Sequence, residues 1–284
     1  MPEIEDFRGQ IPAWCPGCGN LQILRVFKLA MVELGLEPHE LLLVSGIGQA
    51  GKLPHYTRCN TFNGLHGRTL PVAQAIRMAN HGMRVIAVAG DGDCYGEGGN
   101  HFLAAMRRNL NVKLFVHDNQ IYGLTKGQAS PTTGEGMVTG TQPFGVLTPA
   151  MNPVALAVAM DCSLVARGFS GNQEELKELM KTVLEHKGFA VLDIFQNCIV
   201  YNKVNTFQWY KEHCQPVGPE HDPTDREAAF RLALQWGEKI PTGVIYRHER
   251  PLMEDLIPVI AEKEPLVHQP FAQEDVAGEL ERFY

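Results

Sequence analysis

The chain lacks an excess of positive charge, which argues against a nucleic-acid partner. Its 284 residues contain 25 lysines and arginines against 32 aspartates and glutamates, a formal net charge of -7. Proteins that bind nucleic acids neutralise phosphates with basic stripes, and we find no such stripe. We therefore expect no nucleic-acid role.

Long apolar runs are also missing. No stretch reaches the roughly 18 apolar residues that a membrane-spanning helix needs, so we expect no membrane association. The segment Met1 to Asp6 is acidic and lacks the cationic start and apolar core of a signal peptide. We therefore expect a cytoplasmic protein. Its 44% hydrophobic residues are typical of a globular chain, long enough for one large α/β domain or two small ones.

An even set of cysteines is absent, which argues against a disulfide framework. The seven cysteines are Cys15, Cys18, Cys59, Cys94, Cys162, Cys198 and Cys214. An odd number in a cytosolic chain favours metal ligands or free thiols. Cys15 and Cys18 form a Cys-x-x-Cys just after Trp14, in an irregular segment, whereas a thioredoxin-like dithiol follows a strand. A metal or iron–sulfur site is therefore favoured over a redox dithiol.

Polar residues follow two short apolar runs. Residues 84–89 lead into Gly-Asp-Gly-Asp at 90–93, and residues 111–116 lead into Asp118 and Asn119. Both runs are rich in Val, Ile and Leu, as strands of a buried parallel sheet are. The carboxyl ends of such strands meet where ligands bind. Carboxylate and amide oxygens there suit Mg2+ holding a diphosphate, and the glycines let the backbone approach phosphate oxygens.

Alternating strands and helices predict an α/β fold with a parallel sheet flanked by helices. We expect strands at 41–44, 84–89, 111–116, 163–166 and 189–195, and helices at 20–34, 69–80, 96–108, 152–160, 172–186 and 224–236. The pattern breaks after Gln196, and proline and glycine punctuate residues 215–225. We therefore predict an irregular arm at 1–19, the α/β domain at 20–200 and a partner-facing extension at 201–284.

Several motifs together identify a family. The GDG and Asp118-Asn119 pair resembles the thiamine diphosphate motif, in which NN follows GDG. The other motifs are WCPGCG at 14–19, SGIG at 45–48, LHGR at 65–68, YGLTKGQASPT at 122–132 and QNCIVYN at 196–202. Their order resembles that of the β subunit of a 2-oxoacid:ferredoxin oxidoreductase, which has a thiamine-diphosphate-binding fold. Residues 122–132 are most similar to 2-oxoglutarate synthase subunits, so 2-oxoglutarate is the expected substrate, with pyruvate or broad 2-oxoacid specificity as the alternative.

The resemblance implies thiamine diphosphate held through Mg2+. Asp91, Asn119 and the carbonyl of Ile121 are the implied metal ligands, whereas we interpret Asp118 as a cap at a strand end. The residues expected to line the cofactor are Gly48, His66, Gly90, Asp91, Gly92, Asp93, Asn119, Ile121, Gly123, Leu124 and Thr125.

Two residues are implied to contact the substrate. Lys52 is similarly placed to a cation near the substrate in relatives and could pair with the distal carboxylate of a 2-oxodiacid, with Lys126 and Arg68 as alternatives. His66 could contact the diphosphate or the substrate, or could simply be a capped histidine of its loop.

The resemblance also implies a [4Fe-4S] cluster with four cysteine ligands. Cys15, Cys18 and Cys198 match three of them. Relatives have the remaining cysteine directly after SGIG, where this chain has Gln49, which cannot supply a thiolate. We predict that Cys59 substitutes as the ligand, with Cys214 as the reserve. The alternative is that Cys59 is a packed thiol and the cluster is absent, incomplete or capped by a ligand other than cysteine.

The implied reaction is the reversible, CoA-dependent oxidative decarboxylation of a 2-oxoacid, which fixes CO2 in reverse and passes electrons through the cluster to ferredoxin. In this family an α subunit supplies the glutamate that activates the cofactor and most of the CoA site. A heterodimer or a dimer of heterodimers is therefore expected. The alternatives are a thiamine-dependent enzyme without electron transfer, which has no use for Cys15 and Cys18, and a zinc-binding assembly subunit.

Overall fold

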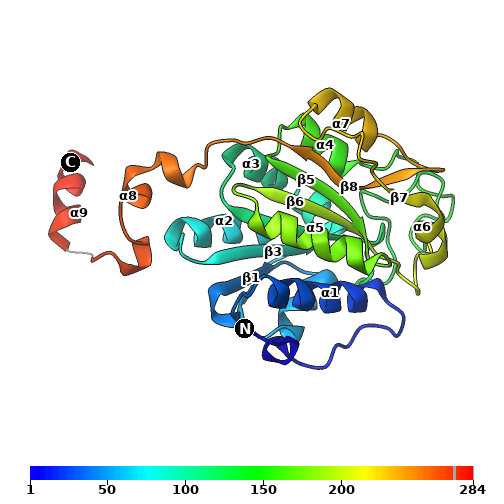
Figure 1. The fold of residues 1–284 in the computed structure, drawn as a ribbon, viewed down its shortest axis with the longest axis horizontal. Helices are drawn as coiled ribbons and strands as arrows, with labels where there is room; N and C mark the ends of the chain where they lie inside the picture. The colour runs from blue at the N-terminus through cyan, green and yellow to red at the C-terminus, as the bar shows by residue number, and fades with distance from the viewer. Residues whose placement is uncertain (271–272, 284) are drawn as a thin grey trace.

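A computed structural model describes residues 1–270 and 273–283. Their fold is centred on one eight-stranded sheet (Figure 1). The strands are β1 (Leu41–Ser45), β2 (Asn60–Asn63), β3 (Arg84–Gly90), β4 (Val112–Asp118), β5 (Leu164–Phe169), β6 (Ala190–Phe195), β7 (Cys214–Pro216) and β8 (Ile240–Arg247). Their order is β2-β1-β3-β4-β6-β5-β8-β7, and every neighbouring pair is parallel except β5 and β8. The predicted α/β fold is confirmed, and its predicted parallel sheet holds for every neighbouring pair except β5 and β8.

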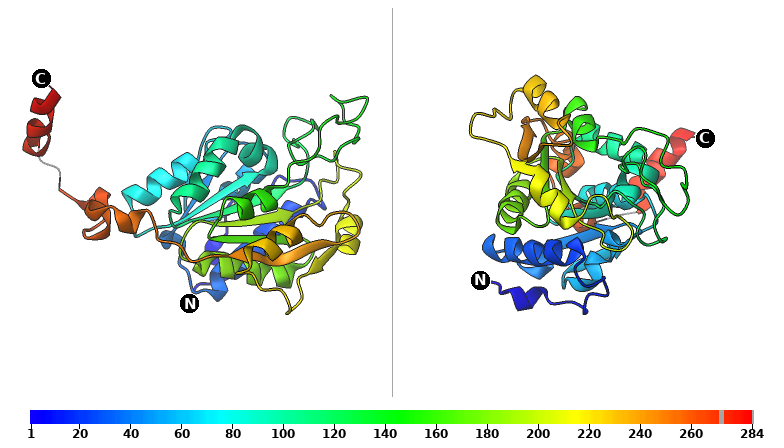
Figure 2. Two further views of the ribbon diagram at one scale, coloured as in Figure 1. Left: turned by 90° about the horizontal axis from the view of Figure 1, so that it is seen from above. Right: turned by 90° about the vertical axis from the view of Figure 1, so that its right-hand side faces the viewer.

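Helices cover both faces of the sheet (Figure 2). The helices of the described residues are α1 (Gly19–Glu33), α2 (Thr69–Ala79), α3 (Gly99–Arg108), α4 (Pro153–Ala159), α5 (Gln173–Glu185), α6 (Phe207–His213), α7 (Arg226–Ala233), α8 (Pro258–Ala261) and α9 (Gln273–Leu280), of which α1 to α5 and α7 pack on the sheet. Strand β3 shows why two layers form. Val85, Ala87 and Ala89 pack toward α2, α3, α4 and α7, while Ile86 and Val88 pack toward α1 and α5. Side chains alternate across a strand, so an apolar run without polar interruption needs cover on both faces.

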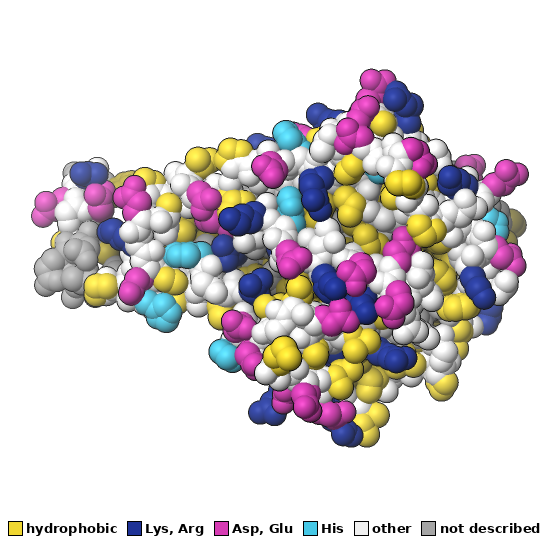
Figure 3. Space-filling model, in the orientation of Figure 1, with side chains coloured by type: hydrophobic (Ala, Val, Ile, Leu, Met, Phe, Trp, Pro, Cys, Tyr) yellow, Lys and Arg dark blue, Asp and Glu magenta, His cyan; other side chains and the backbone are white. Residues whose placement is uncertain are grey.

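Surface charges contribute little to this packing. On the face shown in Figure 3, basic and acidic side chains are interspersed. Lys177 and Lys181 of α5 each lie 2.9 Å from a carboxylate oxygen of Glu33 in α1. Exposed pairs of this kind are typically worth less than about 1 kcal/mol, so the apolar contact between the helices holds them together. In the part of the chain that the structure describes, no helix is long and apolar enough to cross a membrane.

The predicted helices and strands of residues 20–200 lie within a few residues of the observed ones, with two differences. The helix expected at 96–108 starts only at Gly99, because Gly92–Glu97 forms a π-helical turn at the end of β3. Strand β2 was not expected, because its sequence carries no apolar run. In the structure all four residues of Asn60–Asn63 are exposed, which explains the missing signal.

The sheet continues beyond residue 200, which the prediction of a separate extension did not anticipate. Strand β8 pairs antiparallel with β5, and α7 packs on α4 in the main core. Pro241 and Gly243 interrupt the apolar pattern of β8, which is why its sequence reads as irregular. After β8 the chain leaves the sheet, and α8 and α9 project from the body (Figure 1).

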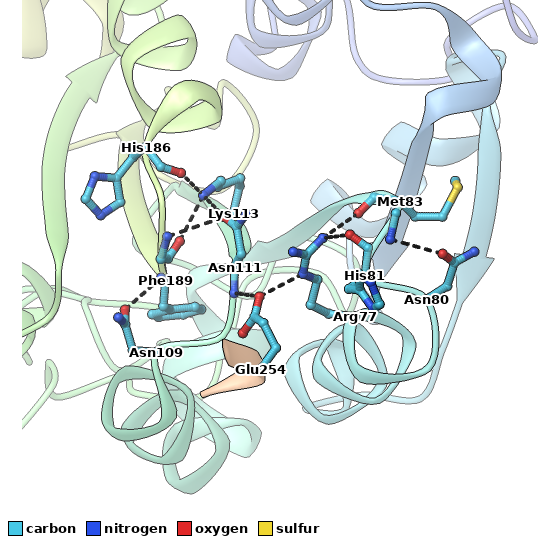
Figure 4. A network of polar contacts seen from close by, with 12 residues as sticks. Arg77, Asn80, His81, Met83, Asn109, Asn111, Lys113, His186, Phe189 and Glu254 are labelled. Atoms are coloured by element: carbon cyan, nitrogen blue, oxygen red, sulfur yellow. Dashed lines mark hydrogen bonds and ion pairs between the residues drawn. The ribbon is translucent and has the colours of Figure 1, made fainter. Parts of the chain in front are cut away.

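Buried polar contacts tie the start of this projecting segment to the amino-terminal edge of the sheet (Figure 4). Glu254 Oε1 accepts hydrogen bonds from Arg77 Nε at 2.9 Å and from the Asn111 backbone N–H at 3.0 Å. Nearby, Lys113 Nζ donates to Asn111 Oδ1 at 2.5 Å, to the Gly188 carbonyl at 2.8 Å and to a third acceptor, the His186 carbonyl. The amino ends of β3, β4 and β6 are thus joined by side chains.

Candidate active site

A pocket lies at the carboxyl-terminal edge of the sheet, where β1, β3, β4 and β6 end. Because these strands are parallel and in register, with Gly90 opposite His117 and Asp118 opposite Phe195, the loops that follow them converge. The pocket is lined by Ile47, Gly48, Gln49, Ala50, His66, Gly90, Asp91, Gly92, Asp93, His117, Asn119, Ile121, Tyr122, Gly123, Leu124, Thr125 and Gln196. All eleven residues expected to line a cofactor are among them.

Asp91 is held by a hydroxyl that it shares with Asp118. Thr132 Oγ1 lies 2.8 Å from Asp91 Oδ2 and 2.9 Å from Asp118 Oδ1. A hydroxyl has one proton to donate, so its contact with both oxygens is most favourable when one of the two carboxyl groups is protonated. Burial raises the pKa of both groups, and nearby Asp193 and Asp91 raise that of Asp118 further. A cation at Asp91 would therefore be accommodated with Asp118 neutral.

Asp118 does not line this pocket. Its Oδ1 accepts from the Gln120 backbone N–H at 3.1 Å, which is a local turn contact at the end of β4. Asn119 does line the pocket, and its Oδ1 accepts from the Ile121 N–H at 3.0 Å while its carbonyl accepts from Asn202. The amide oxygen keeps a second lone pair for a cation.

Asp93 holds two loops together. Its Oδ1 accepts from the backbone N–H groups of Ile47 at 3.1 Å and Gly67 at 2.8 Å, and its Oδ2 accepts from the Thr69 hydroxyl at 2.9 Å. A Cβ added to Gly46 would lie 2.2 Å from Asp93 Oδ2, so only glycine fits there. Although Asp93 lines the pocket, both of its carboxylate oxygens already accept hydrogen bonds that position these loops.

His66 lies between two carboxylates. Its Nδ1 is 2.7 Å from Asp93 Oδ1 and its Nε2 is 3.1 Å from Glu97 Oε2. The Tyr122 hydroxyl donates to the same Glu97 oxygen at 3.0 Å. Glu97 was not among the predicted site residues, because nothing in its local sequence distinguishes it from an ordinary helix-start glutamate. Its contacts depend on the π-helical turn that follows β3.

The predicted cations lie outside the pocket lining. Lys52 is half-buried on a 3-10 helix, Ala50–Tyr56, and has no ion-pair partner within the described part of the chain. Arg68 lies beside His101, with 3.2 Å between nitrogen atoms. Lys126 is exposed on the turn closed by Tyr122 and Gln128, where Thr125 Oγ1 donates to Gln128 at 2.6 Å.

Three cysteines line a second pocket beside the first. Cys15 and Cys18 come from the N-terminal arm and Cys198 from the segment after β6, and Trp14, Asn20 and Gln49 are among its other walls. The arm is fixed to that segment, because the Gly19 N–H donates to the Asn197 carbonyl at 3.2 Å and Asn197 Nδ2 donates to the Gly17 carbonyl at 3.0 Å. Burial and the neighbouring thiols Cys198 and Cys15 raise the pKa of Cys18 to about 11.

The two pockets share walls. Gln49, Asn119, Gly123 and Gln196 line both of them. Within the described residues, no three His, Cys, Asp or Glu side chains converge tightly enough to hold a metal ion. The donor set of the second pocket, three sulfurs around a common space, suits a cluster that several cysteines hold from different sides.

The structure does not bring Cys59 to this pocket. Cys59 precedes β2, whose Asn60 pairs with Leu42 near the start of β1, so it lies toward the amino-terminal edge, away from the pockets. Its side chain packs against the core cluster beneath α1 and α5, and burial raises the pKa of its thiol to about 12. The reserve residue, Cys214, packs instead beside Tyr210.

Two family models match the chain. Residues 46–194 match the family model described as thiamine pyrophosphate enzyme, C-terminal TPP binding domain. Residues 198–262 match the model that describes the C-terminal part of the pyruvate ferredoxin oxidoreductase beta subunit.

Individual relatives are similar over most of the chain. A 2-oxoacid:ferredoxin oxidoreductase subunit beta from a Sulfolobus species is 41% identical over 86% of this chain and 84% of that one. A 2-oxoglutarate oxidoreductase subunit KorB from Mycobacterium tuberculosis is 39% identical over 66% of this chain and 51% of its own length.

A solved structure is similar over nearly the whole chain. It is the 2-oxoglutarate:ferredoxin oxidoreductase from Magnetococcus marinus with 2-oxoglutarate, coenzyme A and succinyl-CoA bound, which is 34% identical. The two chains superpose with a TM-score of 0.91 over 98% of this chain and 96% of that one. The chain therefore belongs to the β subunits of the 2-oxoacid:ferredoxin oxidoreductases.

Proposed function

We propose that this chain is the β subunit of a 2-oxoglutarate synthase. With an α subunit it converts 2-oxoglutarate and CoA reversibly to succinyl-CoA and CO2, and it passes the electrons to ferredoxin. The observation that carries this proposal is the pair of adjoining pockets, one lined by the eleven cofactor residues and one by three cysteines. Similarity to enzymes named for 2-oxoglutarate supports the choice of substrate.

The first pocket suits Mg2+ and the diphosphate of thiamine diphosphate. Asp91, Asn119 and the Ile121 carbonyl would hold the metal, since hard oxygen ligands are what Mg2+ prefers. Gly90 and Gly123 keep the backbone accessible to phosphate oxygens, and Gly92 leaves room for the Tyr122 ring at the pocket wall. When bound, the cofactor supplies an electron sink for decarboxylation. The carboxylate that activates it would come from the α subunit, as would most of the CoA site.

His66 and Lys52 have different roles in this proposal. His66 is fixed between Asp93 and Glu97 at the pocket wall, so its ring would be held in place beside the diphosphate or the substrate. Lys52 lies just beyond the pocket on the helix that follows Gln49, and its ammonium is uncommitted within the described residues. It would pair with the distal carboxylate of 2-oxoglutarate once the site is closed by the α subunit.

Substrates that differ only in the distal carboxylate test this function. We expect the α–β complex to reduce ferredoxin with 2-oxoglutarate and CoA, and more slowly with 2-oxobutyrate. Lys52→Met should lower kcat/KM for 2-oxoglutarate by about 10- to 100-fold, as losing a hydrogen bond to a charged group does, and leave 2-oxobutyrate unaffected.

The matched control is Lys126→Met, which removes an exposed cation on the turn and should affect both substrates equally. A wild-type complex that prefers pyruvate would contradict the substrate, and an equal loss on both substrates in Lys52→Met would contradict the role of Lys52. Reduction by the β subunit alone would contradict the need for the α subunit.

A further inference from the structure

The pocket beside the cofactor site has three cysteines and, in place of a fourth, a glutamine. Cys15, Cys18 and Cys198 lie on its walls together with Gln49. Gln49 is also a wall of the cofactor pocket, so it stands where the two pockets meet. A cluster held by the three thiolates would therefore present its remaining side to Gln49, toward the cofactor.

The side-chain oxygen of Gln49 makes no hydrogen bond within the described part of the chain. This Oε1 atom is buried, so the lack of a partner is costly unless a ligand supplies one. The residue itself is firmly held, because Trp14 Nε1 donates to the Gln49 carbonyl at 2.9 Å. Trp14 in turn packs edge-on against Tyr56, with 4.7 Å between ring centroids.

No other thiol of the described chain is placed to replace the missing cysteine. Cys59 lies toward the amino-terminal edge of the sheet, and bringing it to the pocket would require β2 to separate from β1. Cys94 and Cys162 are fully buried in the core on the α3 face. Cys214 packs against a separate group of buried apolar side chains that includes Tyr210. Moving any of these four cysteines to the pocket would expose apolar surface or separate paired strands.

We propose that this chain holds its iron–sulfur cluster by only three thiolates, those of Cys15, Cys18 and Cys198, with the fourth iron facing Gln49. This inference rests on the proposed function. The fourth iron takes an oxygen ligand, either the Gln49 amide or water, and not a cysteine. An iron without a thiolate is the one most easily lost, so this cluster should convert between four-iron and three-iron forms.

The conversion is an oxidation with a defined balance. The four-iron core with charge 2+ gives a three-iron core with charge 1+, one Fe2+ ion and one electron. Ferricyanide takes that electron and becomes ferrocyanide. The four sulfides and the three cysteine thiolates stay in place, and no thiolate–iron bond needs to break. A fourth thiolate would oppose the loss, because it would bind the departing iron directly.

The test follows iron rather than turnover. The complete α–β complex, prepared anaerobically, is treated with ferricyanide in the presence of an Fe2+ chelator. We expect about four irons per β chain before oxidation and about one released by it, with the low-temperature electron paramagnetic resonance signal of a three-iron cluster. Gln49→Cys should supply the fourth thiolate, so released iron should fall at least about ten-fold and the signal should disappear. Cys59→Ser should behave as wild type.

Different results overturn different statements. Four irons retained by the wild type after ferricyanide, or iron loss on Cys59→Ser, would overturn the three-thiolate cluster and leave the proposed function standing. Absence of iron from a wild-type complex that still decarboxylates 2-oxoglutarate would overturn the electron path as well. If Gln49→Cys does not fold, wild type and Cys59→Ser still decide between the two ligand sets.

Discussion

The two edges of the sheet both bury polar groups but treat them differently. At the amino-terminal edge, Lys113 Nζ has three acceptors and Glu254 Oε1 has two donors. At the carboxyl-terminal edge, the buried side-chain atoms without a partner among the described residues include Asn20 Nδ2, Gln49 Oε1 and His117 Nε2, all from residues that line the two pockets. The amino-terminal edge is less completely satisfied than this contrast suggests, since Glu254 Oε2 and His81 Nδ1 also lack partners among the described residues.

Structural and functional polar groups in this fold differ in whether the chain supplies their hydrogen-bond partners. Buried polar groups are normally hydrogen-bonded, so a group without a partner needs a reason. At the amino-terminal edge the chain itself supplies most partners, and the result is an anchor for the segment around Glu254. At the other edge Asn20, Gln49 and His117 line two adjoining pockets, where a bound cofactor and a cluster would supply the missing partners.

The largest expected effect is the loss of the anchor at the amino-terminal edge. Arg77→Met would leave Glu254 buried and without its cation, since only 3% of the Glu254 side chain is exposed. Removing one partner of a buried ion pair typically costs about 3–5 kcal/mol of the free energy of unfolding. Urea denaturation measures this cost, and limited proteolysis after residue 248 reports whether the projecting segment detaches first.

The matched control combines Arg77→Met with Glu254→Gln, which removes the charge that the single variant leaves unpaired. The double variant should recover part of the lost stability. Both variants should bind thiamine diphosphate as wild type does, because the anchor lies at the opposite edge from the pocket. Equal stability of Arg77→Met and wild type would show that the ion pair is not what secures this segment.

The second-largest expected effect is a loss of cofactor binding at the carboxyl-terminal edge. Asp91→Asn should weaken the binding of Mg2+ and thiamine diphosphate by more than about 100-fold, or nearly 3 kcal/mol. It should not destabilise the fold, because burial raises the pKa of Asp91 and already disfavours its charge. Titration calorimetry and thermal unfolding give the two quantities.

Asp118→Asn is the control for Asp91→Asn, since Asp118 shares the Thr132 hydroxyl but does not line the pocket. Acting only through its neighbour, it should weaken cofactor binding by roughly 10-fold. Equal losses in the two variants would mean that Asp118 itself contacts the metal.

The same contrast explains how far the sequence alone reaches. Strands β3 and β4 are predictable because continuous apolar runs leave few alternatives, and the convergence of Asp91 and Asn119 follows from parallel strands. Gln49 is visible as a departure directly after SGIG. The position of Cys59 is not predictable in this way, since it depends on β2, a strand of four exposed residues, three of them polar, with no periodic signal. Glu97 likewise depends on the π-helical turn that carries it.

The smallest effect concerns pH at the amino-terminal edge. Burial, then the charges of Lys113 and Arg247, lower the pKa of His186 from 6.5 to about 4. Between these values the unfolded chain binds a proton that the folded chain does not, so stability falls as pH drops through this window. Because His186 is partly exposed, we expect only about 1 kcal/mol of loss between pH 7 and pH 5. His186→Asn should flatten that part of the profile, measured by urea denaturation at each pH. If the free energy of unfolding depends on pH in the same way in His186→Asn and wild type, other groups cause the loss of stability in acid. Lys113 would then have no measurable influence on His186.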